Sequence, residues 1–250
     1  MAKKKAPATA GTYENLNSVL WVQTSAEYRA SAVQTYRSAE VNLERALKDR
    51  TWTAAIEQTG PYADLPPAII IDLDETVLDN SAFEARLTAA HSSYSEAAWN
   101  EWVKQAKSSL VPGAAEFLSV AHAHGVEIFY LSNRICDAGN MEDATVAVLR
   151  SHHLPLGKDR LLCKSGEADK AARRALISHN FRVLLLIGDD LSDFVSLSKS
   201  ENTVETRRAI QMAYERYWGD RWFMLPNPTY GSWELAVGFK VNEKLRRLRQ

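Results

Sequence analysis

The sequence predicts an α/β fold with a doubly wound parallel sheet, because three apolar runs alternate with helical patterns along the chain. The runs lie at 68–73, 126–133 and 182–190, and each is continuously apolar, without alternation between apolar and polar residues. Such strands are typical of parallel sheets that helices cover on both faces. Each run also ends in polar residues, and ligands of these sheets bind at the carboxyl ends of the strands.

The 250 residues suffice for one large domain with a smaller appended part. A flexible N-terminus is expected at 1–12, followed by a single domain at 13–250 with its core at about 66–200. The N-terminus has a basic start but no apolar stretch after it, so it is not an intact signal peptide as written. A small helical cap or subdomain is expected from 13–60, 80–110 and 203–250.

The elements can be taken in order along the chain. Apolar residues recur at steps of three and four over 13–58, which predicts one long helix or two. Glycine and prolines in "TGPYADLPP" (59–67) end this part, and the first strand follows. Further helices are expected at 80–110, 111–124, 138–151, 167–180, 203–218 and 232–248, and further strands at 126–133, 160–163, 182–190 and 222–225.

Composition excludes several classes of function. The net charge of −1 gives no electrostatic reason to expect a nucleic-acid polymer or an anionic membrane as partner. The sequence contains no long uncharged apolar run, so no transmembrane helix is expected. Cys136 and Cys163 are too few for a disulfide framework, and two unpaired thiols are expected in preference to one bridge.

Four carboxylates follow the first and third strands and carry the main chemical signal. Asp72 and Asp74 leave the first strand, and Asp189 and Asp193 leave the third. Clustered carboxylates repel one another and resist ionising together unless a positive charge lies among them. Mg²⁺, a hard cation that prefers oxygen ligands, is the expected cofactor. The neighbouring Asp190 is interpreted as a helix cap or a solvated residue.

A hydroxyl and a lysine complete the predicted site. Ser132 ends the second strand, where it can donate a hydrogen bond to an anion, and Lys170 offers an ammonium group. Lys164 remains an alternative to Lys170. Together with two acids and a metal, these groups are the equipment for phosphoryl transfer to a carboxylate nucleophile.

Four stretches resemble, in order and spacing, the signatures of the haloacid dehalogenase superfamily of phosphatases: "DLDETVLDNS", "LSNR", "KAARR" and "IGDDLSDF". Three others, "LWVQTSAEYRA", "VPGAAEFL" and "LPNPTYGSWE", resemble the class C acid phosphatases, a bacterial group that includes lipoprotein acid phosphatases and surface 5′-nucleotidases. The resemblance covers roughly residues 13–235. It implies a Mg²⁺-dependent acid phosphatase that works through an aspartyl-phosphate.

The resemblance also implies a role for each site residue. Asp72 would be the nucleophile and Asp74 the general acid and base. Ser132, Asn133 and Lys170 would bind the phosphoryl group. The metal ligands would be Asp72, the backbone carbonyl of Asp74, Asp189 and the supporting Asp193.

The expected substrates are small phosphomonoesters, namely nucleoside monophosphates and aryl phosphates. By resemblance, Phe83, Trp102 and Tyr230 would flank the aromatic part of the substrate, and core packing is the competing interpretation of these rings. The family's export signals imply a periplasmic or outer-membrane-associated protein, although none is recognised in this chain. The sequence leaves open whether the protein is a monomer or a homodimer.

Other functions remain as alternatives. A receiver domain also surrounds Mg²⁺ with acids, a hydroxyl and a lysine, but it places its parts in another order and in about half this length. A catalytically silent binding protein on a similar fold is disfavoured because Asp72 and Asp74 are both present. A dehalogenase is disfavoured because those enzymes do not keep the second acid.

Overall fold

The computed structural model describes residues 15–136, 140–164, 166 and 169–248. The expected flexible segment 1–12 lies outside these residues. The described part of the chain contains a five-stranded sheet in the order β5-β4-β1-β6-β7, with every pairing parallel, which confirms the predicted fold class. Its strands are β1 (Pro67–Ile71), β4 (Glu127–Leu131), β5 (Leu161–Leu162), β6 (Arg182–Gly188) and β7 (Trp222–Met224).

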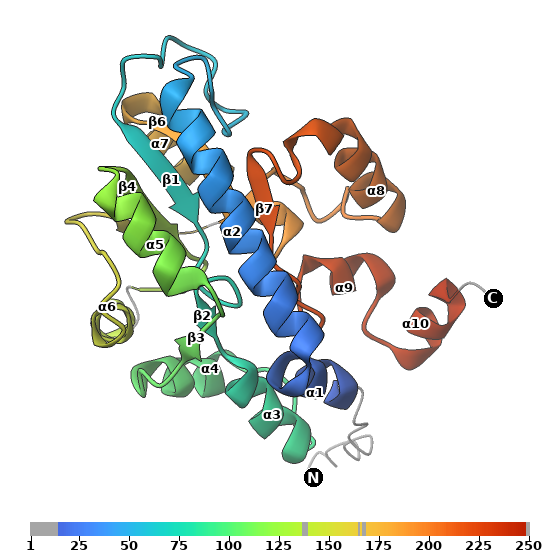
Figure 1. Ribbon diagram of the computed structural model, residues 1–250. Helices are drawn as coiled ribbons and strands as arrows, with labels where there is room; N and C mark the ends of the chain where they lie inside the picture. The colour runs from blue at the N-terminus through green and yellow to red at the C-terminus, as the bar shows by residue number, and fades with distance from the viewer. Residues whose placement is uncertain (1–14, 137–139, 165, 167–168, 249–250) are drawn as a thin grey trace, which may run out of the picture.

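Helices cover both faces of this sheet (Figure 1). α2 (Ala26–Lys48) and α5 (Ala114–Ala123) pack on one face, where their apolar residues meet Ile69 and Ile71 of β1. α7 (Ala171–Asn180) packs on the other face, with Ala68 and Ile70. Adjacent residues of β1 thus point to opposite faces and are buried on both, which is why the strand sequence is continuously apolar.

The predicted helical stretch 13–58 is two helices, α1 (Leu16–Thr24) and α2. They meet at Ser25, whose extended backbone ends α1 and whose hydroxyl accepts a hydrogen bond from the backbone amide of Tyr28 in the first turn of α2. A serine N-cap of this kind favours a new helix over a continuous one.

The inserted stretch 80–110 is helical only in part. α3 (Ser81–Ala89) and α4 (Glu96–Lys104) lie in it, beside a small antiparallel pair of β2 (Leu78–Asp79) and β3 (Ser109–Leu110). α4 packs against α6 (Met141–Ser151), which begins after the undescribed residues 137–139. These elements group below the carboxyl ends of the strands in Figure 1.

The C-terminal third departs from the predicted helices at two places. The helix expected at 203–218 ends at Ala213 as α8 (Val204–Ala213), and a 3-10 turn, η2 (Glu215–Tyr217), follows. This turn lets Tyr214 and Tyr217 pack on Trp222 of β7, each with its ring centroid 4.8 Å from that of the indole. The helix expected at 232–248 is divided into α9 (Ser232–Val237) and α10 (Val241–Arg247) by Gly238, at φ 90°. The remaining 3-10 turn, η1 (Leu191–Asp193), follows β6.

The expectation of two unpaired thiols was wrong, because Cys136 and Cys163 form a disulfide. The parallel neighbours β4 and β5 pair Leu131 with Leu162, so the segments that follow the two strands lie side by side. The Cα atoms of the two cysteines are 5.8 Å apart. None of the helices in the described residues combines the length and apolar character needed to cross a membrane.

Candidate active site

Three neighbouring strands bring polar residues to one edge of the sheet. Asp72 follows β1, Ser132 follows β4 and Asp189 follows β6. Because β1 pairs with both other strands, these positions lie beside one another. The chain moves outward from β1 through β4 and β5 and then returns to β6 on the other side. Open α/β sheets bind ligands at such a reversal.

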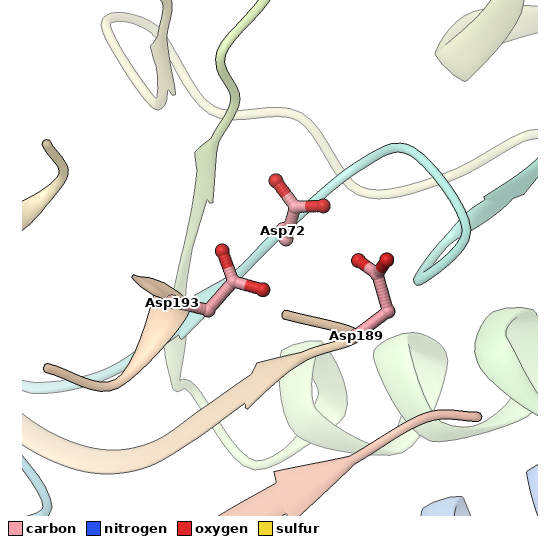
Figure 2. A group of neighbouring side chains, drawn as sticks. All are labelled: Asp72, Asp189 and Asp193. Atoms are coloured by element: carbon pink, nitrogen blue, oxygen red, sulfur yellow. The ribbon is translucent and has the colours of Figure 1, made fainter. Parts of the chain in front are cut away.

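An acidic cluster forms at this edge from Asp72, Asp189 and Asp193, whose carboxylates point toward one another in Figure 2. One oxygen of each lies within 4.8 Å of the others. Asp193 reaches the cluster from η1 by packing directly over Gly188, where a Cβ atom would collide with its side chain. Glycine at the end of β6 therefore permits the cluster to form.

Burial changes the proton affinity of the acidic cluster. It raises the pKa of Asp72 to about 7, an effect that Lys170 opposes and Asp193 reinforces. Burial, assisted by the charges of Asp72 and Asp193, raises the pKa of Asp189 well above its usual value. A carboxylate that resists ionisation in this way is stabilised by a nearby cation.

Lys170 is the cation that the chain itself supplies. The residue is 3% exposed, and its Nζ donates to Asp72 and, at 2.6 Å, to Asp193 Oδ1. Burial lowers the pKa of Lys170, but the two carboxylates more than compensate, so that its pKa is raised. Lys164, the alternative lysine, contributes its backbone amide to the carbonyl of Arg134 at 2.9 Å.

Asp74 is not a member of the acidic cluster and forms an ion pair with Arg134. The guanidinium of Arg134 donates to it through Nε, 3.0 Å from Oδ2, and through a terminal nitrogen, 2.6 Å from Oδ1. Asn80 donates its amide to the same Oδ1 at 2.9 Å. Arg134 is 2% exposed and also donates to Thr145 Oγ1 at 3.1 Å. Sequence reasoning did not assign Arg134, although it directly follows Ser132 and Asn133 in "LSNR".

The two polar residues predicted to bind phosphate lie at the end of β4. Ser132 is fully buried, and its hydroxyl accepts a hydrogen bond from the backbone amide of Arg134 at 3.0 Å. Asn133 is exposed. Arg173 of α7 donates to the Ser132 carbonyl at 2.7 Å and to Asn133 Oδ1 at 2.6 Å. Arg174, the second arginine of "KAARR", is buried. Its guanidinium donates to backbone carbonyls of η1, including that of Asp193 at 3.0 Å.

The three aromatic residues predicted to bind substrate occupy different positions. Phe83 and Trp102 are each 3% exposed and pack together in a small apolar cluster with Met141. The indole NH of Trp102 donates to Asn80 Oδ1 at 2.9 Å, so Trp102 supports the amide that contacts Asp74. The contact of Phe83 and Trp102 with substrate stays a prediction. Because both rings are buried, they offer little surface to a substrate in this conformation.

Tyr230 is half-buried, and its hydroxyl donates to the buried carboxyl group of Glu75. Glu75 adopts a left-handed backbone conformation, at φ 59°, immediately after Asp74. Burial, with Asp74 and Asp189 nearby, raises the pKa of Glu75 well above its usual value. Sequence reasoning missed Glu75 because a glutamate after two acids carries no distinctive pattern.

The acidic cluster fits a hard divalent cation. All its donor atoms are carboxylate oxygens, the ligands that Mg²⁺ prefers. Lys170 places one positive charge among three carboxyl groups, so the ionised cluster keeps an excess of negative charge. Asp190 is not part of this set, because it caps η1 through Ser192 and accepts two bonds from Ser232, which confirms its interpretation as a cap.

Comparison with known proteins agrees with this geometry. The family model described as HAD superfamily, subfamily IIIB (acid phosphatase) matches residues 3–233. The structure of the class C acid phosphatase from Bacillus anthracis is similar to this chain with a TM-score of 0.82 and 30% sequence identity, over 97% of this chain and 99% of that one. The class C acid phosphatase from Bacillus anthracis with tungstate bound has a TM-score of 0.84 at the same identity and coverage.

A curated plant protein is a more distant relative. The stem 31 kDa glycoprotein of Glycine max is 24% identical over 165 residues, which are 64% of this chain and 58% of that protein. The chain thus matches little more than half the length of this relative, whereas the family model and the bacterial structures match nearly all of the chain. The chain therefore belongs to the HAD superfamily, subfamily IIIB, the acid phosphatases, and is a hydrolase of phosphate monoesters.

Proposed function

We propose that the protein is a Mg²⁺-dependent phosphatase that acts on nucleoside monophosphates and aryl phosphates through an aspartyl-phosphate. The observation that carries this proposal is the separation of the strand-end acids into two environments. Asp72 lies in the acidic cluster beside Lys170, whereas Asp74 is held apart by Arg134. Two carboxylates in different environments can perform different chemical tasks.

The first step would use both acids at once. A carboxylate oxygen of Asp72 attacks phosphorus, the bond from phosphorus to the leaving oxygen breaks, and Asp74 gives its proton to that oxygen. In the second step the oxygen of a water molecule bonds to phosphorus while Asp74 takes its proton, and the bond from phosphorus to Asp72 breaks, which releases inorganic phosphate and regenerates the carboxylate. Arg134 and Asn80 orient Asp74 for both transfers, because they hold its carboxylate between them.

Binding of the phosphoryl group would involve Ser132, Asn133 and Lys170. Lys170 supplies a desolvated positive charge, which is most effective against the charge that develops in the transition state. A Mg²⁺ ion held by Asp72, Asp189, Asp193 and the Asp74 carbonyl would supply further charge neutralisation. Tungstate, bound in the similar Bacillus anthracis enzyme, is an oxyanion like phosphate, which supports an oxyanion site here.

The aromatic substrates are proposed from Phe83, Trp102 and Tyr230. Stacking on a base contributes about 1–3 kcal/mol and tolerates different bases, because every base offers a π-face. Tyr230 is the best placed of the three, since it is half-buried beside Glu75 and the other two rings are buried. Tyr230→Ala is expected to weaken nucleoside and aryl substrates while sparing small aliphatic phosphates.

The decisive experiment measures the release of phosphate from nucleoside, aryl and aliphatic monoesters by the metal-free protein, with and without Mg²⁺. We expect activity with Mg²⁺, its loss on chelation and its return when Mg²⁺ is added. Asp72→Asn is the matched inactive variant, because an amide does not attack phosphorus. Full activity in chelator would exclude a role for the metal in catalysis. Retention of more than a tenth of wild-type kcat by Asp72→Asn, which raises the activation free energy by under ~1.4 kcal/mol, would exclude Asp72 as the nucleophile.

The same measurement addresses the alternative of a catalytically silent or receiver-like protein. Such a protein would bind Mg²⁺ and phosphate without turnover. Multiple turnovers on any monoester of the panel would exclude it.

We also infer that the protein works in an oxidising compartment, in agreement with a periplasmic or outer-membrane-associated location. The disulfide between Cys136 and Cys163 supports this inference, because such bonds persist outside the reducing cytosol. Export would be tested by fractionating the native host and blotting each fraction, and a purely cytosolic protein would contradict it.

A further inference from the structure

The loop between β7 and α9, residues 225–231, contacts both acidic segments of the site, the one after β1 and the one after β6. Asn227 donates its amide to Asp189 Oδ2 at 2.8 Å. Tyr230 donates its hydroxyl to Glu75. At the end of the loop, Ser232 donates its backbone amide and its hydroxyl to Asp190, at 2.7 and 2.6 Å. The loop thus reaches the segments that follow both β1 and β6.

The orientation of the Asn227 amide is determined by its own loop. Its Oδ1 accepts from the Thr229 backbone amide at 3.0 Å and from the Thr229 hydroxyl at 2.6 Å. A rotated amide would direct its NH₂ group at these donors. The NH₂ group must therefore face Asp189, with a hydrogen atom available for that carboxylate.

Asp189 is held at both of its oxygens. Asn227 donates to Oδ2, and the hydroxyl of Thr76, in the loop after β1, donates to Oδ1 at 3.1 Å. Thr76 is fully buried, and its own carbonyl accepts from the Tyr36 hydroxyl at 2.6 Å. Both oxygens of the carboxylate are thereby held by groups that are themselves anchored.

The partners of Asp189 differ in charge from those of the other two acids. Asp72 and Asp193 share the ammonium group of Lys170. The donors that contact Asp189 in the described part of the chain, Asn227 and Thr76, are neutral. Neutral donors orient the carboxyl group of Asp189 without supplying a counter-charge, so a bound cation is the group that would stabilise its ionised form.

We propose that Asn227 and Thr76 are positioning residues for the cation site, and that they set its affinity by holding Asp189 in the rotamer turned toward Asp72. This inference rests on the proposed cation dependence. Partners that orient a metal ligand are typically worth 10–100-fold in metal affinity. Asn227 and Tyr230 both belong to "LPNPTYGSWE". On this proposal the stretch orients a metal ligand through Asn227 and contacts the substrate through Tyr230.

The test is the dissociation constant of Mg²⁺, measured by isothermal titration calorimetry on chelator-stripped protein, with no substrate present. Asn227→Ala and Thr76→Val should each weaken Mg²⁺ binding about tenfold. Thr76→Ser, which keeps the hydroxyl, should stay within about twofold of wild type.

Asn202→Ala is the matched control for a loosened loop. Its amide donates to the Ser232 carbonyl at 2.8 Å, so the substitution removes an anchor at the first residue of α9, where the loop ends, without removing a contact of Asp189. We expect its Mg²⁺ affinity to be unchanged. Thermal melts establish that each variant is folded, and Thr76→Val tests the inference independently if Asn227→Ala is not folded.

The outcomes separate the two proposals. Wild-type affinity in both Asn227→Ala and Thr76→Val, or an equal loss in Asn202→Ala, would overturn the positioning role while leaving the cation site in place. Wild-type protein that binds no Mg²⁺ would overturn the cation site and this inference with it.

Discussion

Lys170→Met removes the only charge of the side chain and keeps most of its length, which makes it the sharpest test of the site. The Nζ atom of Lys170 is buried between Asp72 and Asp193, so the variant leaves two carboxylates without their shared partner. Removing one member of a buried ion pair costs about 3–5 kcal/mol. For a chain of 250 residues, at about 2–4 °C per kcal/mol, the melting temperature should fall by roughly 6–20 °C.

The catalytic effect should be separable from the loss of stability. Deleting one preorganised charge or donor at a developing negative charge typically lowers kcat about 10²–10³-fold. The assay is kcat/KM on an aryl phosphate with saturating Mg²⁺, at a temperature at which melts show the variant to be folded. Mg²⁺ should also raise the melting temperature of Lys170→Met more than that of wild type, because the carboxylates have lost their internal cation.

Lys164→Met is the matched control, since the backbone amide of Lys164 still bonds Arg134 after the substitution. It should leave both kcat/KM and melting temperature near wild type. An equal or larger catalytic loss in Lys164→Met, or a loss of less than tenfold in Lys170→Met, would refute the assignment of Lys170.

Three further predictions follow from the same structure. Arg134→Met should lower kcat about 10²-fold with little change in KM, because Asp74 loses its orientation; unchanged kcat in the folded variant would contradict this. Cys163→Ser should lower the free energy of unfolding by ~3–4 kcal/mol, since the disulfide closes a sequence separation of 27 residues, and equal denaturation midpoints of oxidised and reduced wild type would argue against it. Burial raises the pKa of Glu84 from 4.5 to about 7, so the folded protein holds the Glu84 proton more tightly than the unfolded chain. The stability that Glu84 contributes is therefore fully present below pH 4.5 and is lost as the pH rises through 7. Glu84→Gln should therefore melt higher than wild type at pH 8 but not at pH 4, and parallel pH profiles of the two proteins would exclude the effect.

The strands and their acidic ends could be predicted because their signals are local. Continuous apolar runs specify buried parallel strands, and the position after each run places Asp72 and Asp189 at one edge. The side chains that hold Asp74 could not be predicted in this way. Arg134 and Asn80 are ordinary residue types whose importance for Asp74 depends on distances across the fold.

The errors have a common physical origin in tertiary contacts. Cys136 and Cys163 are joined because β4 and β5 are neighbours, which no spacing in the sequence reveals. The helix expected beyond Ala213 gives way to a turn, because Tyr214 and Tyr217 gain more by packing on a buried indole than by continuing the helix. The periodicity of apolar residues predicts which side chains are buried but not which side chains they pack against in the tertiary structure.

The bond between Cys136 and Cys163 also makes a closed covalent ring of the segment that contains α6 and the edge strand β5. Lys158 and Asp159 lie exposed on a turn within that ring, where a protease has access to the backbone. A single cut there would leave both fragments attached to each other, because Cys136, which follows β4, stays bonded to Cys163, which follows β5. The nicked enzyme would migrate as one species on a non-reducing gel and as two fragments after reduction, so partial digestion need not release either fragment.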